Sequence, residues 1–99
     1  MFMIREVMQC RPGKVREMVK KFNDLGSVMQ KLGYKPFRVY TDVSGEHFWT
    51  LVLESEAQSL NDFLAVEDKV MADKGAQSIM AGYHDLVERG RREIYRVES

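Results

Sequence analysis

The order in which the spacing of apolar residues changes along the chain is the feature that most constrains its fold. Apolar residues alternate in 2–10, as in a strand, and then recur every three or four positions as far as about Leu32, as in a helix. Strand-like alternation returns at 35–42 and 47–54, separated by a short turn at 43–46. Helical spacing follows, and 92–98 is expected to form the last strand. This order predicts an α+β protein with a four-stranded antiparallel sheet and helices packed on one face.

Turn and capping residues indicate where the helices should begin and end. Pro12 suits the first turn of the first helix, where its missing N–H costs nothing, and Gly33 suits the C-terminal end of that helix. Residues 55–58 have the spacing of a capping box, so a second helical segment should follow them and end at the break over 73–75. A third helix is expected over 76–89, ended by Gly90. The second segment is expected to bury Leu60, Phe63, Leu64, Val70 and Met71.

Apolar residues on both faces of the expected sheet predict a partner. Alternation in 47–54 puts Trp49 and Leu51 on one face and Phe48 and Val52 on the other. Helices on one side can cover only one of these faces, and an exposed apolar patch is typical of an interface. We therefore expect a second copy of the chain to stack sheet against sheet, which would make a barrel-like homodimer.

Length and composition narrow the class of protein. The 99 residues fit one domain, expected to span 1–99, and an apolar fraction of 44% suits a globular protein. The 15 basic and 15 acidic residues cancel, which argues against a dedicated nucleic-acid binder. No apolar run is long enough to cross a bilayer, and Arg5 comes too early for a signal peptide. Because the single Cys10 cannot form an intrachain disulfide, the cytoplasm is the expected location.

Two short motifs connect this arrangement with a known superfamily. The sequence Arg-Pro-Gly-Lys at 11–14 leads out of the first strand, and the hairpin at 41–46 runs into Trp-Thr-Leu-Val-Leu-Glu at 49–54. In these features the chain resembles the dimeric α+β barrel superfamily, which has a ferredoxin-like βαββαβ fold, and in particular NIPSNAP-like proteins and antibiotic-biosynthesis-type monooxygenases. The resemblance implies a homodimer, often with a pocket between sheet and helices. It implies no single reaction, because members range from enzymes to proteins with no known activity.

Histidines and tyrosines on the strands and the third helix are the candidates for catalysis. His47 would shuttle a proton beside an aromatic wall, and the structural alternative is a histidine bonded to the adjacent turn. His84 likewise has a structural alternative to a catalytic role, because Glu88 lies one helical turn later and can share a surface hydrogen bond with it. The catalytic candidates are His47, Tyr40 and His84.

A ligand pocket is expected to use Trp49, Tyr83 and Arg38. Trp49 would stack on a flat ligand or lie in the core with its N–H bonded. Arg38 and Tyr40 would bind an acidic ligand group or else pair across the dimer interface. Arg5 and Glu6 occupy opposite faces of the first strand, so each needs a partner from elsewhere in the chain if it is buried.

These observations favour a homodimeric barrel protein of undefined activity with a small apolar ligand pocket. The alternative is a cofactor-free monooxygenase acting on an aromatic substrate, which needs an apolar cavity with polar groups to deprotonate the substrate and hold an oxyanion. No cofactor is expected. No metal site is expected either, because the chain lacks a His-Glu-x-x-His motif and a cysteine pair.

Two further functions fit the topology less well. Similar proteins that degrade heme combine a tryptophan, an asparagine and a helical histidine; Trp49 and His84 could play two of these parts, but the first strand contains no asparagine. RNA-recognition motifs share the order of elements. The strand at 47–54 lacks their Lys/Arg-Gly-Phe-Gly pattern, and the chain lacks their excess of basic residues.

Overall fold

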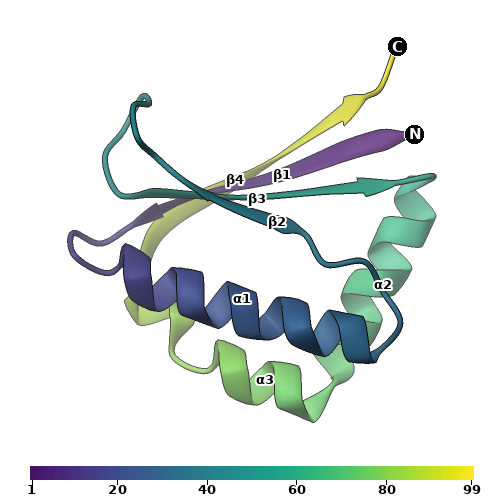
Figure 1. The fold of residues 1–99 in the computed structure, drawn as a ribbon, viewed down its shortest axis with the longest axis horizontal. Helices are drawn as coiled ribbons and strands as arrows, with labels where there is room; N and C mark the ends of the chain where they lie inside the picture. Colours follow the sequence, from purple (N-terminus) through teal and green to yellow (C-terminus); the bar gives the residue numbers. More distant parts are fainter.

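The computed structural model describes residues 1–99 and contains one antiparallel sheet covered on one side by helices (Figure 1). The strands are β1 (Phe2–Cys10), β2 (Arg38–Thr41), β3 (Thr50–Ala57) and β4 (Val87–Arg96), and they pair in the order β2-β3-β1-β4. The helices are α1 (Val15–Lys31), α2 (Leu60–Ala72) and α3 (Lys74–Met80), followed by a 3-10 turn at Tyr83–Asp85. The predicted α+β, ferredoxin-like fold class is therefore confirmed. None of the helices combines the length and the apolar composition needed to span a bilayer.

The core lies between α1 and the centre of the sheet. Leu51 and Leu53 of β3 face the helices and are almost completely buried. They pack with Cys10 at the end of β1 and with an apolar stripe of α1. The stripe has the spacing of three and four that puts residues on one face of a helix, and consists of Met18, Phe22, Leu25 and Met29.

The two ends of α1 differ in how well they follow the prediction. The helix begins at Val15, so Pro12 lies in the turn before it and not in its first turn as expected. Gly13 explains the difference, because its φ of +79° interrupts any helix between Pro12 and Val15. Gly33 has a φ of +89° just beyond the helix, which confirms it as the C-terminal stop.

The expected strand at 47–54 is shifted by three residues toward the C-terminus. β3 begins at Thr50, and Trp49 has a φ of +62°, which is outside the range of a strand. Hydrogen bonds hold this conformation: the Cys10 N–H donates to the Trp49 carbonyl at 2.8 Å, and the Thr50 N–H donates to the Asp42 carboxylate at 2.8 Å. His47 and Trp49 therefore lie before β3, and the expectation that they belong to the strand, with Trp49 on the face of Leu51, is wrong.

β3 also continues beyond its expected end. The pairs Ile4–Ser55 and Phe2–Ala57 carry the strand through the proposed capping box at 55–58, because β1 offers unpaired backbone groups there. The residue that caps α2 is Ser59, whose hydroxyl accepts the N–H of Asp62 at 3.1 Å. The capping box was therefore predicted four residues too early.

The predicted third helix over 76–89 is wrong in its second half. α3 ends at Met80, and Gly82 then takes a left-handed conformation with φ +81°. The chain turns back through residues 83–85 and begins β4 at Val87, where the prediction had a helix up to Gly90. Pairing with β1 explains the change, since Val87 is opposite Cys10 and the Leu86 carbonyl accepts the Arg11 N–H at 2.9 Å.

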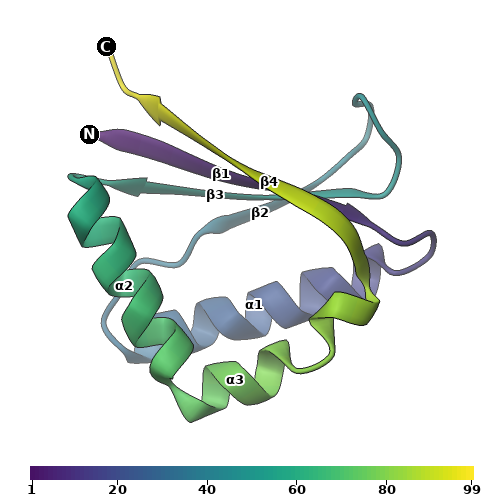
Figure 2. The same cartoon turned by 180° about the vertical axis from the view of Figure 1, so that it is seen from behind.

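α2 buries fewer residues than expected. Figure 2 shows it leaving the end of β3 and running away from the sheet toward α3. Val70 is buried and Phe63 is partly buried, as predicted. Leu60, Leu64 and Met71 are instead 41%, 47% and 55% exposed, so the prediction that they are core residues is wrong. The inclination of α2 leaves space between this helix and the sheet.

The face of the sheet away from the helices is more polar than expected. Its central apolar residues are Val7 and Val52, which are paired with each other, while Phe48 lies in the loop before β3 and is 82% exposed. Around the two valines lie charged side chains, including Arg5, which pairs with Glu93 at 3.6 Å. The predicted second apolar face is therefore reduced to a narrow strip.

Candidate functional site

A hollow of about 530 Å³ lies between the sheet and the helices, and we call it the interlayer pocket. Of its 21 lining residues, 14 are hydrophobic. A volume of this size and an apolar lining are typical of sites for small molecules. The wall is formed by Leu53 of β3, Phe22 and Met29 of α1, and Phe63 and Val66 of α2.

The inclination of α2 accounts for the pocket. α2 is fixed at its start by the Ser59 cap and at its end by Asp73, whose carboxylate caps α3 by accepting the Ala76 N–H at 2.9 Å. Between these ends, Val70 reaches the core, while Phe63 and Val66 face the space below the sheet. The helix therefore closes one side of the pocket without filling it.

Three charged side chains form the most polar part of the pocket wall. Arg92 of β4 donates from Nε to Glu6 of β1 and from Nη2 to Glu67 of α2, both at 2.6 Å. The guanidinium carbon of Arg92 also lies 4.9 Å from the ring centre of Phe63, in the geometry of a cation–π contact. This charged triad, Glu6–Arg92–Glu67, joins the sheet to α2 beside the pocket.

The triad favours a positive charge at its centre. Burial lowers the pKa of the Arg92 guanidinium, but the hydrogen bond from Arg92 to Glu6 and the charges of Glu6 and Glu67 raise it more, so the pKa lies above its ordinary value. One arginine between two carboxylates leaves the triad with a formal charge of −1. The oxygens Glu6 Oε2 and Glu67 Oε1 accept no hydrogen bond from the protein.

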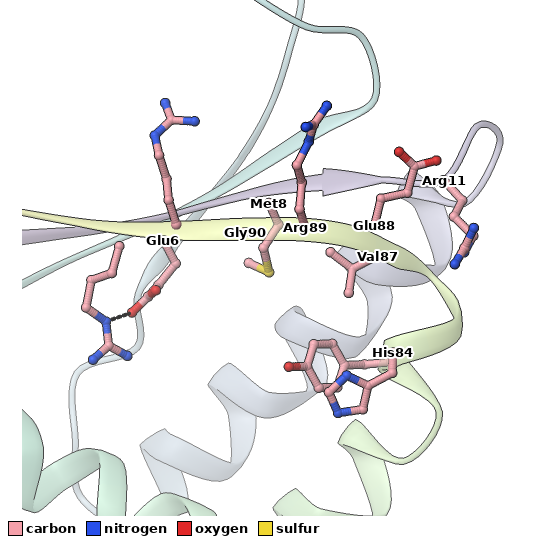
Figure 3. A pocket seen from close by; sticks show the side chains of 11 residues that line it. Glu6, Met8, Arg11, His84, Val87, Glu88, Arg89 and Gly90 are labelled. Carbon is pink, nitrogen blue, oxygen red and sulfur yellow. Dashed lines mark hydrogen bonds and ion pairs between the residues drawn. The ribbon is translucent and has the colours of Figure 1, made fainter.

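A second hollow, of about 750 Å³, adjoins the first, and we call it the polar hollow (Figure 3). It lies along β4 and shares four lining residues with the interlayer pocket: Glu6, Met8, Tyr83 and Arg92. Gly90 contributes to its shape, because a Cβ at this position would lie 3.4 Å from the Met8 Cγ. The charged residues of its lining are Glu6, Glu88, Arg11, Arg89, Arg91 and Arg92. Figure 3 shows the Arg89 side chain pointing away from the hollow, and Arg91 binds Glu93 on the uncovered face of the sheet.

Two of the residues predicted for a site lie at these hollows. Tyr83 lines both of them, and His84 lines the polar hollow. Their rings are 4.2 Å apart between centres, in the 3-10 turn after Gly82. Figure 3 shows the His84 ring below β4. The structure therefore brings together one pocket candidate and one catalytic candidate.

The other four candidates line neither hollow. Tyr40 and Arg38 lie on the uncovered side of β2, where the Tyr40 hydroxyl donates to Glu54 at 3.1 Å. A hydrogen bond with Tyr40 raises the pKa of the Arg38 guanidinium. His47 and Trp49 lie in the loop between β2 and β3, and both side chains are exposed.

The sequence predicts a distant partner for a buried Glu6, but it does not identify the members of the charged triad. Glu6 lies on the same side of β1 as Met8 and Cys10, and this side faces the helices. A carboxylate on such a side requires a cationic partner. The partner, Arg92, is 86 residues away in the chain, and only the pairing of β1 with β4 identifies it.

The comparisons with known proteins agree on the fold. No family model matches the chain, and no similar sequence is found among curated proteins. A NIPSNAP family protein of unknown function from Agrobacterium tumefaciens superimposes with a TM-score of 0.80 at 22% identity, over 96% of this chain and 86% of that one. An uncharacterised NIPSNAP domain protein from Burkholderia xenovorans gives 0.81 at 17% identity, over 100% and 96%.

A third solved structure belongs to the other group that the sequence resembles. A candidate antibiotic biosynthesis monooxygenase from Nitrosomonas europaea has a TM-score of 0.74 at 13% identity, and the match covers both chains completely. The structural neighbours of this chain are thus NIPSNAP family proteins and antibiotic-biosynthesis-monooxygenase-like proteins, and what they have in common with it is the ferredoxin-like α+β fold.

Proposed function

We propose that this protein binds a small, mainly apolar molecule in the interlayer pocket. The observation that carries the proposal is the apolar hollow of about 530 Å³ left between α2 and the sheet. An apolar cavity of this size is costly to leave without contacts, because its lining loses the dispersion energy that close packing provides. A ligand of matching shape would restore those contacts.

A pocket-filling substitution tests this proposal. Val66→Trp places a large ring in the pocket, whereas Ala65→Trp adds the same ring at the neighbouring exposed position of α2. We expect the neutral fluorescent probe N-phenylnaphthylamine to bind the native protein and the Ala65→Trp variant, and to lose most of its binding to Val66→Trp. Thermal unfolding of both variants checks that they remain folded. Equal binding to the two variants would contradict a site in the interlayer pocket.

We further propose that the protein acts as a homodimer in which the uncovered sheet faces stack. Support comes from the Val7–Val52 strip, from the exposed aromatic residues Tyr40 and Tyr95, and from the buried Arg5 Nε, which has no hydrogen-bond partner within the chain. A second sheet would cover the strip and could offer an acceptor to Arg5.

The mass of the protein in solution tests the dimer. Multi-angle light scattering should give about twice the chain mass for the native protein, and one chain mass for Val52→Arg, which puts a charge at the centre of the proposed interface. Gln30→Arg, on the exposed side of α1, is the matched control and should remain dimeric. A monomeric native protein would refute the stacking.

The second candidate function is a cofactor-free monooxygenase acting on an aromatic substrate. It is supported by the contact between Tyr83, which lines the apolar pocket, and His84, which lines the adjoining polar hollow, and by the fold shared with a candidate monooxygenase. A reaction of this class would oxidise a ring CH₂ to a carbonyl, consuming one O₂ and releasing one water. Oxygen uptake with a tricyclic phenolic ketone is the test. The rate should fall in His84→Ala, and an absence of uptake would leave binding as the function.

A further inference from the structure

Aromatic rings surround the interlayer pocket. Its lining includes Phe22, Tyr34, Phe37, Phe63 and Tyr83, from four different segments of the chain. Phe22 and Phe37 meet edge to face, with centres 5.9 Å apart and planes at 76°. The face of an aromatic ring carries a negative partial charge and attracts cations as well as apolar groups. A pocket of this kind accepts an apolar ligand whether or not the ligand carries a positive charge.

The charges of the lining residues indicate whether the pocket favours a cationic or an anionic ligand. Apart from Glu56, whose side chain lies on the uncovered face of β3, the pocket is lined by three carboxylates and two cationic groups, which gives it a formal charge of −1. The carboxylates are Glu6, Asp62 and Glu67, and the cations are Lys35 and Arg92. The guanidinium of Arg92 already pairs with the carboxylates of Glu6 and Glu67. The potential inside the pocket therefore opposes an anionic ligand.

Arg92 itself shows that the pocket wall holds a cation. Its guanidinium lies over the ring of Phe63 and between two carboxylates, each at 2.6 Å. Since an ionised carboxylate can accept bonds at both of its oxygens, Glu6 and Glu67 each keep one oxygen for another donor. Ring faces and carboxylate oxygens together form the surroundings that an ammonium group requires.

We propose that the interlayer pocket selects an apolar molecule that carries an amino group, with its ammonium on the free oxygens of Glu6 and Glu67 and its apolar part among the aromatic rings. This inference rests on the proposed ligand-binding function.

Three compounds with one skeleton test the inference: phenylbutylamine, phenylbutanol and phenylbutyrate. Their binding to the native protein is measured by isothermal titration calorimetry at pH 7. We expect the amine to bind about tenfold more tightly than the alcohol, equivalent to about 1.4 kcal/mol, and the acid to bind most weakly. The preference for the amine should decrease as salt is added, because charges near a protein surface are screened.

Two substitutions and one matched control identify the groups responsible. Glu67→Gln keeps the shape of the side chain and should remove most of the preference for the amine while the alcohol still binds. Glu88→Gln, which changes a carboxylate that lines only the polar hollow, is the matched control and should keep the preference. Phe63→Leu keeps every charge and should reduce the ratio of amine to alcohol affinity, which provides a second measurement should Glu67→Gln fold poorly.

The outcomes separate this inference from the function on which it rests. If none of the three compounds binds, the proposed ligand-binding function fails. If the alcohol or the acid binds as tightly as the amine, the pocket binds ligands but the selection for a cation is refuted. A preference that survives in Glu67→Gln and is lost in Glu88→Gln would refute the assignment of the ammonium to Glu6 and Glu67.

Discussion

Replacement of Gly82 by alanine tests the most extensive difference between the sequence prediction and the structure. Gly82 separates α3 from the 3-10 turn, and its φ of +81° is a conformation that residues with a Cβ adopt only with strain. A Cβ built at Gly82 meets no atom within 4 Å, so the substitution adds backbone strain and no steric clash.

The size of the effect follows from two opposing contributions. Left-handed backbone costs a residue with a Cβ about 1–2 kcal/mol. Alanine also restricts the unfolded chain, which returns about 0.4–1 kcal/mol of stability. We therefore expect Gly82→Ala to lower the free energy of unfolding by about 1 kcal/mol, and to lower Tm by about 4–8 °C in a domain of this size.

Urea unfolding followed by circular dichroism measures the change. Gly82→Asn should cost less than Gly82→Ala, because asparagine enters the left-handed region more readily. If residues 76–89 formed a continuous helix, the same alanine would stabilise the protein by roughly 0.5–1 kcal/mol. The two arrangements thus predict opposite signs, and a stabilised Gly82→Ala variant would refute the turn at Gly82.

Three further predictions follow from local contacts. Ser59→Ala removes the cap of α2 and should cost about 1 kcal/mol in urea unfolding, whereas Ser55→Ala should show no capping loss. Burial raises the pKa of the Cys10 thiol, so the neutral thiol should stabilise the fold below the pKa of the unfolded thiol, and this stabilisation should be lost as the pH rises through the folded pKa. Rapid labelling of the native protein by a thiol reagent near neutral pH would contradict the burial of Cys10. A hydrogen bond from Arg91 lowers the pKa of the Glu93 carboxyl, so this pair stabilises the fold above the ordinary carboxyl pKa, and the stabilisation is lost as the pH falls through the lowered pKa. In an NMR titration, Arg91→Ala should shift the Glu93 carboxyl pKa upward.

Local sequence predicted an element correctly where the residues that define it lie within that element. The apolar stripe of α1 and the left-handed glycine after it define that helix without reference to the rest of the chain. The alternation of Leu51 and Leu53 likewise defines the core side of β3. The hydrophobic periodicity mispredicted the ends of elements that are set by pairing with a neighbouring strand, because backbone pairing with β1 takes residues 55–57 and 87–91 into strands.

The candidate site was harder to predict, because its residues come together only in the folded chain. Tyr83 was identified as an aromatic residue that follows the apolar spacing, and it lines the pocket although the helix expected there is absent. Trp49 was identified in the same way and lies outside both hollows, since its backbone leaves the strand direction at φ +62°. The same pattern of residue types therefore led to one pocket residue and one loop residue.

For this protein, the amino-acid sequence alone determined the order of strands and helices and hence the antiparallel sheet with helices on one side, because periods of two and of about 3.6 residues are local properties of the chain. Tertiary structure alone decided the site. The hollow depends on the inclination of α2, and the charged triad depends on strand pairing that brings Arg92 beside Glu6 across 86 residues. Such contacts are settled by the simultaneous burial and pairing of distant segments, which no local pattern encodes.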